Sequence, residues 1–292
     1  MIKKMIYFNL AFDLIKFIVK LLLIKCNNLR SSLRISFNKQ TSRKSIIIGT
    51  GPSLIKDIHE IKNHKKDECD FFAVNFFAKT ETFLQLRPNY YFLADKLFWS
   101  EDLNKNFNQL RNDIYQKLKK VNWKISILCP ESGYDYIKSR LLENPNISFI
   151  KIPEKSINLS TKKMQLFALH SRFFSIANIN SMVTLLWYSI ICNYSEIYLY
   201  GVDFSGFKSI TVDQKTNYVS VPVKHFYKNS KAEKDSANKY KSKSNKSLSE
   251  RLYQNYRVLK FTDLLSDLAI SRRIEIINRS SFSYIDSFKR EK

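Results

Sequence analysis

The sequence predicts an α/β fold in which a mostly parallel, Rossmann-like sheet carries helices on both faces, preceded by an N-terminal amphipathic helix. Three observations predict it. Short apolar segments alternate with helical segments, several apolar segments end in Asn or Asp, and the first of them runs into a glycine-containing turn. Strands that alternate with helices are typical of parallel sheets, because each parallel crossover needs a long connection.

The first 25 residues predict a helix that lies at a membrane interface. Residues 5–24 are mostly apolar, but Asp13, Lys16 and Lys20 interrupt them at helical spacing, which disfavours a bilayer span. No small-residue cleavage site follows, which disfavours a signal peptide. We expect peripheral binding to the cytoplasmic face of the inner membrane, aided by flanking lysines and arginines. The alternative is a helix packed on the protein itself.

Residues 26–44 are polar and basic and are expected to form a linker, so that one globular domain spans residues 45–292. A lysine-rich stretch within it, residues 224–246, is expected to be a solvated loop, with a lid over an anionic substrate as the alternative. The remaining elements follow from apolar patterning and turn residues. Strands are expected at residues 45–48, 70–75, 90–95, 124–130, 147–152, 196–203 and 274–278, and helices at 101–120, 180–191 and 252–269.

The most informative segment joins the first expected strand to a helix. The residues Gly49-Thr50-Gly51-Pro52-Ser53 hold two of only five glycines in 292 residues. Glycine permits a sharp turn and close approach of a ligand, Pro52 suits a first helical turn, and Ser53 can bond free backbone N–H groups. A strand, a glycine turn and a helix start form an anion-binding corner, for which a nucleotide phosphate is the natural ligand. The alternative is an ordinary β–α turn.

Polar residues end four of the expected strands: Asn75, Asp95, Asp203 and Asn278. The carboxyl ends of parallel strands share one edge, where ligands bind in open α/β sheets. We therefore expect these residues to lie beside the Gly49 turn at an active site. The alternative is that they cap strands and begin turns.

Charge and cysteine usage limit the chemistry. The net charge of +23 indicates an anionic partner: nucleic acid, an acidic membrane or a phosphorylated substrate. The four cysteines and four histidines show no zinc-ligand spacing, and no Asp-x-Asp pair occurs, so we expect no metal site and no cofactor. The few, widely spaced cysteines suit a reducing cytoplasm.

Three segments together resemble a known family. They are Ile48-Gly49-Thr50-Gly51-Pro52-Ser53-Leu54, Val74-Asn75-Phe76-Phe77, and the stretch from Glu196 to Phe204. Over roughly residues 45–288 the chain resembles the bacterial sialyltransferases of glycosyltransferase family 42. It also resembles related polysaccharide-biosynthesis proteins that share a domain of unknown function with the motility accessory factors.

The resemblance implies a GT-A-like fold, a CMP-activated sugar donor and inversion at the anomeric carbon without a metal. It implies that Gly49 to Ser53 cradle the nucleotide, that Asn75 bonds cytidine, ribose or phosphate, and that Asp203 lies beside the ribose. Asp95 stands where the sialyltransferases carry an asparagine, and Asn180 and Ser181 match a segment that faces the donor. His225 would be the base that takes the acceptor proton, since a histidine titrates near neutral pH.

The sequence departs from the family at two places. Thr50 replaces an asparagine of the turn, and no tyrosine follows Asp203-Phe204 to hold the leaving phosphate, so Arg172, Lys208, Tyr218 and Lys224 are candidates for that task. These departures bear on the identity of the sugar more than on glycosyl transfer.

We therefore predict a glycosyltransferase that moves a sialic acid-like or other sugar to a lipopolysaccharide or capsule acceptor, a glycan or glycolipid. Nucleic acid is not expected as a partner, and the chain can form oligomers. A diphosphokinase-like phosphotransferase on the same fold and a non-enzymatic basic binding protein are the alternatives.

Overall fold

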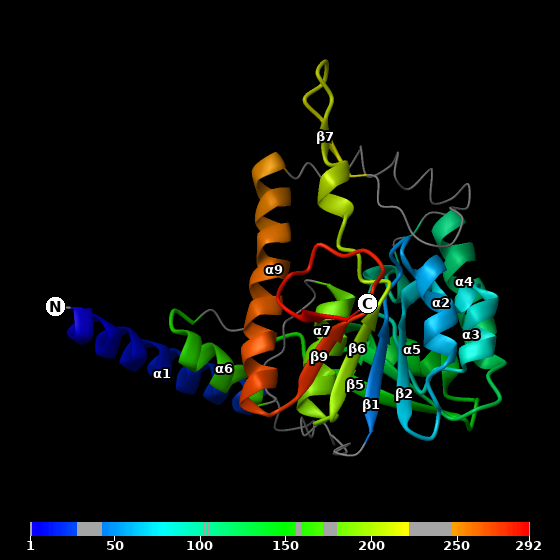
Figure 1. Ribbon diagram of the computed structural model, residues 1–292, viewed down its shortest axis with the longest axis horizontal. Coiled ribbons are helices and arrows are strands. Elements are labelled where there is room, and N and C mark those ends of the chain that lie inside the picture. The colour runs from blue at the N-terminus through cyan, green and yellow to red at the C-terminus, as the bar shows by residue number, and fades with distance from the viewer. Residues whose placement is uncertain are drawn as a thin grey trace.

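The computed structural model describes residues 2–27, 43–101, 103, 105–155, 159–171, 180–221 and 247–291. A central sheet forms the body, α1 leads away from it, and the β7–β8 hairpin projects from its upper edge (Figure 1). The helices are α1 (Ile2–Asn27), α2 (Leu54–Lys62), α3 (Glu81–Leu86), α4 (Lys105–Lys119), α5 (Tyr134–Leu141), α6 (Lys162–His170), α7 (Ser181–Ile191) and α9 (Leu248–Ser271), with short 3₁₀ helices η1 (Asn75–Lys79), η2 (Lys96–Phe98), η3 (Glu131–Gly133) and η4 (Gly206–Ser209). The strands are β1 (Lys44–Ile48), β2 (Cys69–Val74), β3 (Tyr90–Phe92), β4 (Ile125–Pro130), β5 (Ile147–Ile152), β6 (Glu196–Tyr200), β7 (Thr211–Val212), β8 (Val219–Ser220), β9 (Glu275–Asn278) and β10 (Lys289–Arg290).

The sheet has eight strands in the order β10-β9-β6-β1-β2-β3-β4-β5, and each neighbouring pair is parallel. The chain moves outward from β1 to β5 and then returns to place β6 on the other side of β1. The strand order therefore reverses between β1 and β6, which is the topological switch point of a doubly wound sheet. The predicted α/β fold with a mostly parallel sheet is confirmed.

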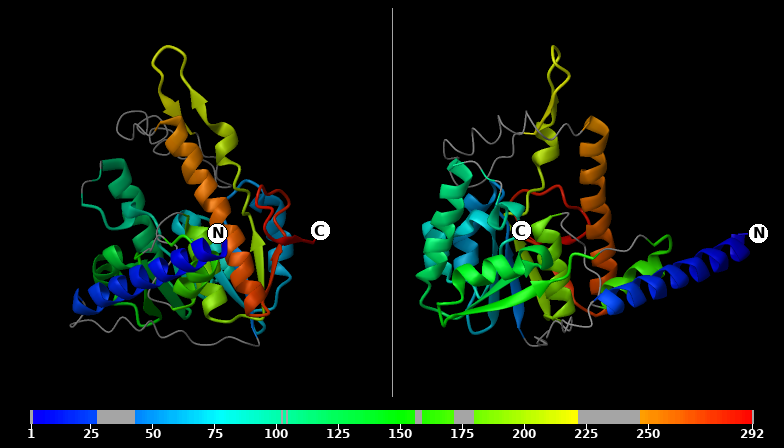
Figure 2. Two further views of the ribbon diagram at one scale, coloured as in Figure 1. Left: turned by 90° about the vertical axis from the view of Figure 1, so that its left-hand side faces the viewer. Right: turned by 180° about the vertical axis from the view of Figure 1, so that it is seen from behind.

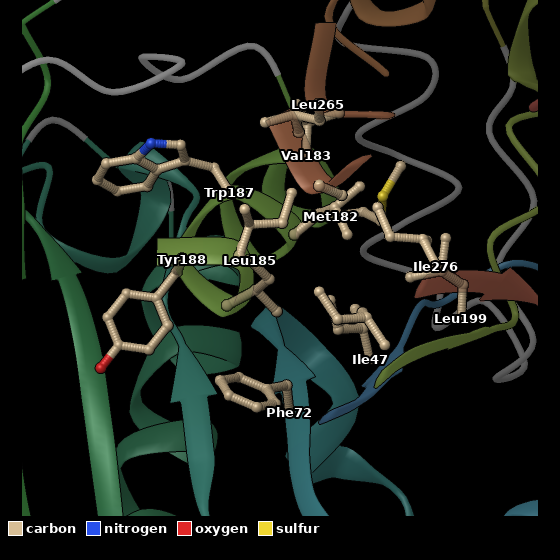
Figure 3. Close-up of a cluster of buried hydrophobic side chains, with 14 of the residues drawn as sticks. Ile47, Phe72, Met182, Val183, Leu185, Trp187, Tyr188, Leu199, Leu265 and Ile276 are labelled. Carbon is tan, nitrogen blue, oxygen red and sulfur yellow. The ribbon is translucent and has the colours of Figure 1, made fainter. Parts of the chain in front are cut away.

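Helices cover both faces because the strands are apolar on both sides. Ile46 and Ile48 point into a core shared with α2, α3, α4 and α5, whereas Ile47 points into a core with α7 and α9. Figure 3 shows the second core, where Ile47 and Phe72 of the sheet meet side chains of α7 and Leu265 of α9. Strands buried on both faces read as continuous apolar runs, as β1 and β2 do.

The N-terminal helix packs on the body at α6, and its free end lies far from the sheet (Figure 2). Phe17 forms a small cluster with Leu159, Met164 and Ala168, separate from the two main cores. Asp13, which belongs to the predicted polar stripe of this helix, is buried against the start of α6 rather than exposed to water. Within the described parts of the chain, no helix combines the length and apolarity that crossing a membrane requires.

Several boundaries differ from those expected. β2 ends at Val74 and β6 at Tyr200, so Asn75 begins the 3₁₀ helix η1 and Asp203 lies in the loop after β6. β3 ends at Phe92, and Asp95 caps η2 by accepting a hydrogen bond from the Leu97 amide at 3.0 Å. β9 is not the final strand, because β10 follows it and pairs in parallel with it.

Candidate functional site at the switch point

The turn after β1 packs directly against the turn after β6. The Gly49 amide donates to the Tyr200 carbonyl and the Gly51 amide to the Gly201 carbonyl, both at 2.8 Å. A Cβ atom on Gly49 would lie 2.3 Å from the Gly201 oxygen, and one on Gly51 would lie 2.4 Å from an Asp203 carboxylate oxygen. The two glycines are thus required by the close contact of two loops, and not only by a ligand as the sequence suggested.

A buried carboxylate holds this contact together. Asp203 accepts hydrogen bonds from the Ser53 hydroxyl and from the Ser53 amide, the latter at 3.0 Å. Burial raises the pKa of Asp203, and the nearby Asp57 raises it further, while the bonds from Ser53 oppose the shift. Ser53 therefore serves a protein carboxylate and does not cap α2 with its side chain.

Asp57 is a second buried carboxylate, and the sequence analysis missed it. It accepts from the Gly201 amide at 3.0 Å, from the Ser281 amide at 3.0 Å and from the Ser53 hydroxyl at 3.2 Å. It therefore ties α2 to the loop after β6 and to the loop after β9. Its position in the first turn of α2, where acidic residues favour the helix dipole, was the available signal.

The start of α2 is consequently less open to an anion than the sequence predicted. The Ser53 amide is bonded to Asp203, and the Leu54 amide donates to the Gly51 carbonyl at 3.1 Å. A protein carboxylate already occupies the position where a phosphate was expected. The turn after β1 therefore shapes the wall of the site, whereas most of its backbone amides already donate to protein acceptors.

The start of α7 is the more open anion position. Asn180 caps this helix, with its side-chain oxygen accepting from the Met182 amide at 2.9 Å. Within the described residues no hydrogen bond takes up the amides of Ser181 and Val183 or the side-chain nitrogen of Asn180. Free amides at the first turn of an eleven-residue helix favour a bound anion.

Asn75 lies opposite this helix in a left-handed conformation, with φ of 46°. Its side-chain oxygen accepts from the Ala94 amide at 2.9 Å, and its carbonyl accepts from the Tyr91 hydroxyl. No partner for its side-chain nitrogen occurs among the residues the structure describes, so this nitrogen remains a donor for a ligand. Phe204 also has positive φ, 48°, so two residues of the site hold an uncommon backbone conformation.

These groups surround one cavity of about 390 Å³ at the carboxyl ends of β1 and β6. It contains the predicted residues Gly49, Thr50, Gly51, Pro52, Asn75, Asn180, Ser181 and Asp203. Ser53 lies behind its wall, bonded to Asp203, whereas Asp95 and Asn278 do not line it. Asn278 is fully buried and bonds Ser283 at 3.0 Å, so it fits the alternative of a structural turn residue.

Several cavity residues were not predicted, notably Ser205, Gly206, Ser209, Val221 and Asn255. Gly206 offered a signal in the sequence, because the chain has only five glycines. In the structure the space beside Gly206 is open, since a Cβ atom added there would meet no atom within 4 Å. Asn255 offered none, because it comes from α9, far along the chain. Asp203 is the one ionisable side chain among the described residues that line the cavity.

The predicted base and two of the predicted phosphate-binding cations cannot be located relative to the cavity. His225, Arg172 and Lys224 lie outside the described residues, as does the lysine-rich stretch 224–246. Lys208 does not line the cavity, since its ammonium lies 4.6 Å from the centre of the Tyr284 ring. Tyr218 is exposed on the β7–β8 hairpin.

Fold and site together define a doubly wound α/β protein with a ligand cavity at its switch point. No protein-family model and no curated protein matches the sequence. Among solved structures, a similar chain is the sialyltransferase CstII from Campylobacter jejuni, in complex with a substrate analogue, cytidine-5'-monophosphate. It is 18% identical, the match covers 85% of this chain and 84% of that chain, and the TM-score is 0.39. Because this similarity is low, the fold rests on the strand order seen here, and function must be argued from the site.

Proposed function

We propose that the cavity binds the nucleotide part of a CMP-activated sugar and that the protein is an inverting, metal-independent glycosyltransferase. The observation that carries the proposal is the convergence of the β1 turn, Asn75 and the start of α7 on one cavity at the switch point. The resemblance in sequence supports it, because most of the donor-binding residues that it implied line this cavity.

In the proposed reaction the donor phosphate lies at the start of α7. An acceptor hydroxyl attacks the anomeric carbon, the bond from that carbon to the phosphate oxygen breaks, and CMP leaves. In this proposal the Ser181 amide and the side-chain nitrogens of Asn180 and Asn75, all from residues that line the cavity, stabilise the charge that develops on the phosphate. His225 is proposed as the base for the acceptor proton, on the resemblance alone.

The proposed acceptor is a surface glycan or glycolipid of the lipopolysaccharide or capsule type, with a sialic acid-like sugar as donor group. We also propose that the protein works at the cytoplasmic face of the inner membrane, where lipid-linked acceptors are available. The N-terminal helix supports this location, because large apolar side chains along it are exposed.

The proposal is tested by thermal unfolding of the full chain with CMP, CDP, UDP, GDP and ATP, each with and without magnesium. A ligand that binds only the folded protein raises its melting temperature. We expect CMP to raise it equally with and without magnesium. We expect Asn75→Asp to abolish the shift, because this change keeps the oxygen that bonds Ala94 but replaces the free donor with a negative charge.

Asn217→Asp is the matched control, because Asn217 also has positive φ, 56°, but lies on the β7–β8 hairpin and not in the cavity. It should respond to CMP as the unmodified chain does. A magnesium-dependent response to ATP would favour the phosphotransferase, and the absence of any response would contradict a nucleotide site.

A further inference from the structure

An exposed apolar face runs along α1. It comprises Tyr7, Phe8, Phe12, Leu14, Ile15, Ile18, Val19 and Leu22, which we call the outer face. Phe8 is 71% exposed and Ile15 59% exposed. Phe8, Phe12, Ile15, Val19 and Leu22 recur at intervals of three or four residues, so they form one stripe. Contiguous exposed apolar surface of this extent is typical of a docking site.

The opposite side of α1 is fixed to the protein by a buried carboxylate. Asp13 has no exposed surface, and it accepts from the Ser160 amide at 2.9 Å, from the Thr161 amide at 2.8 Å and from the Thr161 hydroxyl at 2.9 Å. Burial alone would raise the pKa of Asp13, but the hydrogen bonds from Ser160 and Thr161 outweigh it, and the pKa is lowered. Asp13 thus ties α1 to the two residues that directly precede α6.

This contact sets the rotation of α1 about its axis. Phe17, one turn after Asp13, packs against Phe167 of α6 with ring centres 5.1 Å apart. With Asp13 and Phe17 on the protein side, the outer face must point away from the body. Lys16 and Lys20 lie between the two sides, with the Lys16 ammonium 4.3 Å from the Phe12 ring centre.

Charge favours a lipid surface over a second copy of the chain as the partner of this face. The chain carries a net charge of +23, so two copies repel each other, whereas an anionic bilayer attracts the chain. A helix with an apolar face flanked by lysines matches the boundary between acyl chains and anionic headgroups.

We propose that the outer face of α1 docks into the headgroup region of an anionic membrane and that Asp13 is the positioning residue that turns this face outward. The proposal rests on the proposed membrane location and is independent of the reaction at the cavity. It identifies which side of α1 meets lipid and why the apolar face does not fold back onto the protein.

The test measures sedimentation of the full chain with sucrose-loaded vesicles of phosphatidylethanolamine and phosphatidylglycerol, and with neutral phosphatidylcholine vesicles. Ile15→Glu places a charge in the outer face and should lower the partition coefficient for anionic vesicles by about tenfold or more. Asp13→Asn should also lower it, by about tenfold, because the outer face is no longer held outward. Charge alone would predict the opposite result, because Asp13→Asn removes a negative charge and so strengthens the attraction to anionic vesicles.

Glu81→Gln is the matched control, because it makes the same charge change at an exposed carboxylate of α3 and should bind at least as well as the unmodified chain. Asp13→Glu should partly restore binding. The far-UV circular dichroism spectrum and the melting temperature of each variant, neither of which depends on a ligand, check that the body is folded. Undiminished binding of Ile15→Glu would refute the lipid-docking face, and undiminished binding of Asp13→Asn would refute the positioning role. A dimer that light scattering detects without lipid and that Ile15→Glu dissociates would assign the face to a second copy instead.

Discussion

At the scale of single residues, the site depends on side chains that serve the protein and the ligand with different atoms. Asn75 accepts from the Ala94 amide through its side-chain oxygen, and Asn180 accepts from the Met182 amide in the same way. Both residues line the cavity, and among the described residues neither side-chain nitrogen has a hydrogen-bond partner. Asp203 differs, because both of its oxygens bond Ser53. The sequence located all three residues but could not assign their atoms, since this depends on neighbours far along the chain.

His64 is part of a hydrogen-bond network with Tyr200 and Glu60. It lies half-buried beside Tyr198, its Nε2 is 2.8 Å from the Tyr200 hydroxyl, and that hydroxyl donates to Glu60 at 2.9 Å. Arg279 also bonds Glu60, at 2.7 Å. Burial lowers the pKa of His64, with the charges of Arg279 and Lys44 acting in the same direction and Glu60 opposing them.

This shift predicts a pH dependence of stability. Because the folded-state pKa of His64 lies below its ordinary value of 6.5, its contribution to the free energy of unfolding is present above pH 6.5 and is lost as pH falls through the folded-state pKa. The free energy of unfolding, measured with urea at each pH, should therefore fall between pH 7 and pH 5. We expect this fall to be smaller for His64→Gln than for the unmodified chain. His59→Gln, which replaces an exposed histidine of α2, the helix that ends shortly before His64, is the control. Equal slopes of stability against pH for all three chains would refute the assignment.

At the scale of elements, α7 has a packing role and a binding role. It is buried along its length between the sheet and α9, where Trp187 donates to the Leu169 carbonyl at 3.2 Å. Its N-terminus opens into the cavity (Figure 3 shows the buried part). The rigid core thus fixes the position of the amides that we assign to the donor phosphate.

The two roles of Asn180 can be separated. Asn180→Ala removes the cap and should lower the free energy of unfolding by about 1 kcal/mol, as well as weaken CMP binding. Asn180→Asp keeps an oxygen for the Met182 amide and suits the helix dipole, so it should retain stability while its added charge weakens CMP binding by about tenfold or more. Urea unfolding and calorimetric titration with CMP measure the two effects. If Asn180→Asp bound CMP normally, the phosphate would not lie at this helix.

At the scale of the whole molecule, the boundary of the globular domain is set by contacts that precede the expected start at Ser45. Arg43 bonds both oxygens of the buried Asp70, at 3.1 and 2.7 Å, and the Asp67 carbonyl at 2.6 Å. Tyr194 donates to the same carboxylate at 2.8 Å. Arg43 therefore neutralises the buried carboxylate of Asp70 near the start of β2, although the sequence analysis assigned Arg43 to a basic linker.

We expect a chain that begins at Ser42 to be more stable than one that begins at Lys44, by about 1–3 kcal/mol. The upper end is below the cost of breaking a fully buried pair, because the Arg43 side chain is 28% exposed. Both chains lack α1, so its loss cancels in the comparison of their urea unfolding curves. Equal stability would mean that solvent replaces Arg43 at Asp70 without cost.

The sequence by itself determined the longer strands of the sheet and most of the predicted residues of the cavity. Apolar runs that end in turn residues predicted the strands β1, β2, β4, β6 and β9, and the shared edge of parallel strands brought Asn75 and Asp203 together with the β1 turn. These inferences succeeded because strand periodicity and sheet polarity are local rules. The short β10 and the β7–β8 hairpin were missed, since two-residue strands carry too little pattern to detect.

Only the tertiary structure decided which polar groups are free and which are already used. It showed that Asp203 occupies the start of α2, that α7 provides the open helix terminus, and that Asp13 turns the apolar face of α1 outward. The bonds of Asp203 and Asp13 join residues more than a hundred positions apart along the chain, in contrast to the neighbour patterns that a sequence displays. The sequence predicts where polar residues stand, and long-range hydrogen bonding decides which of them remain available to a ligand.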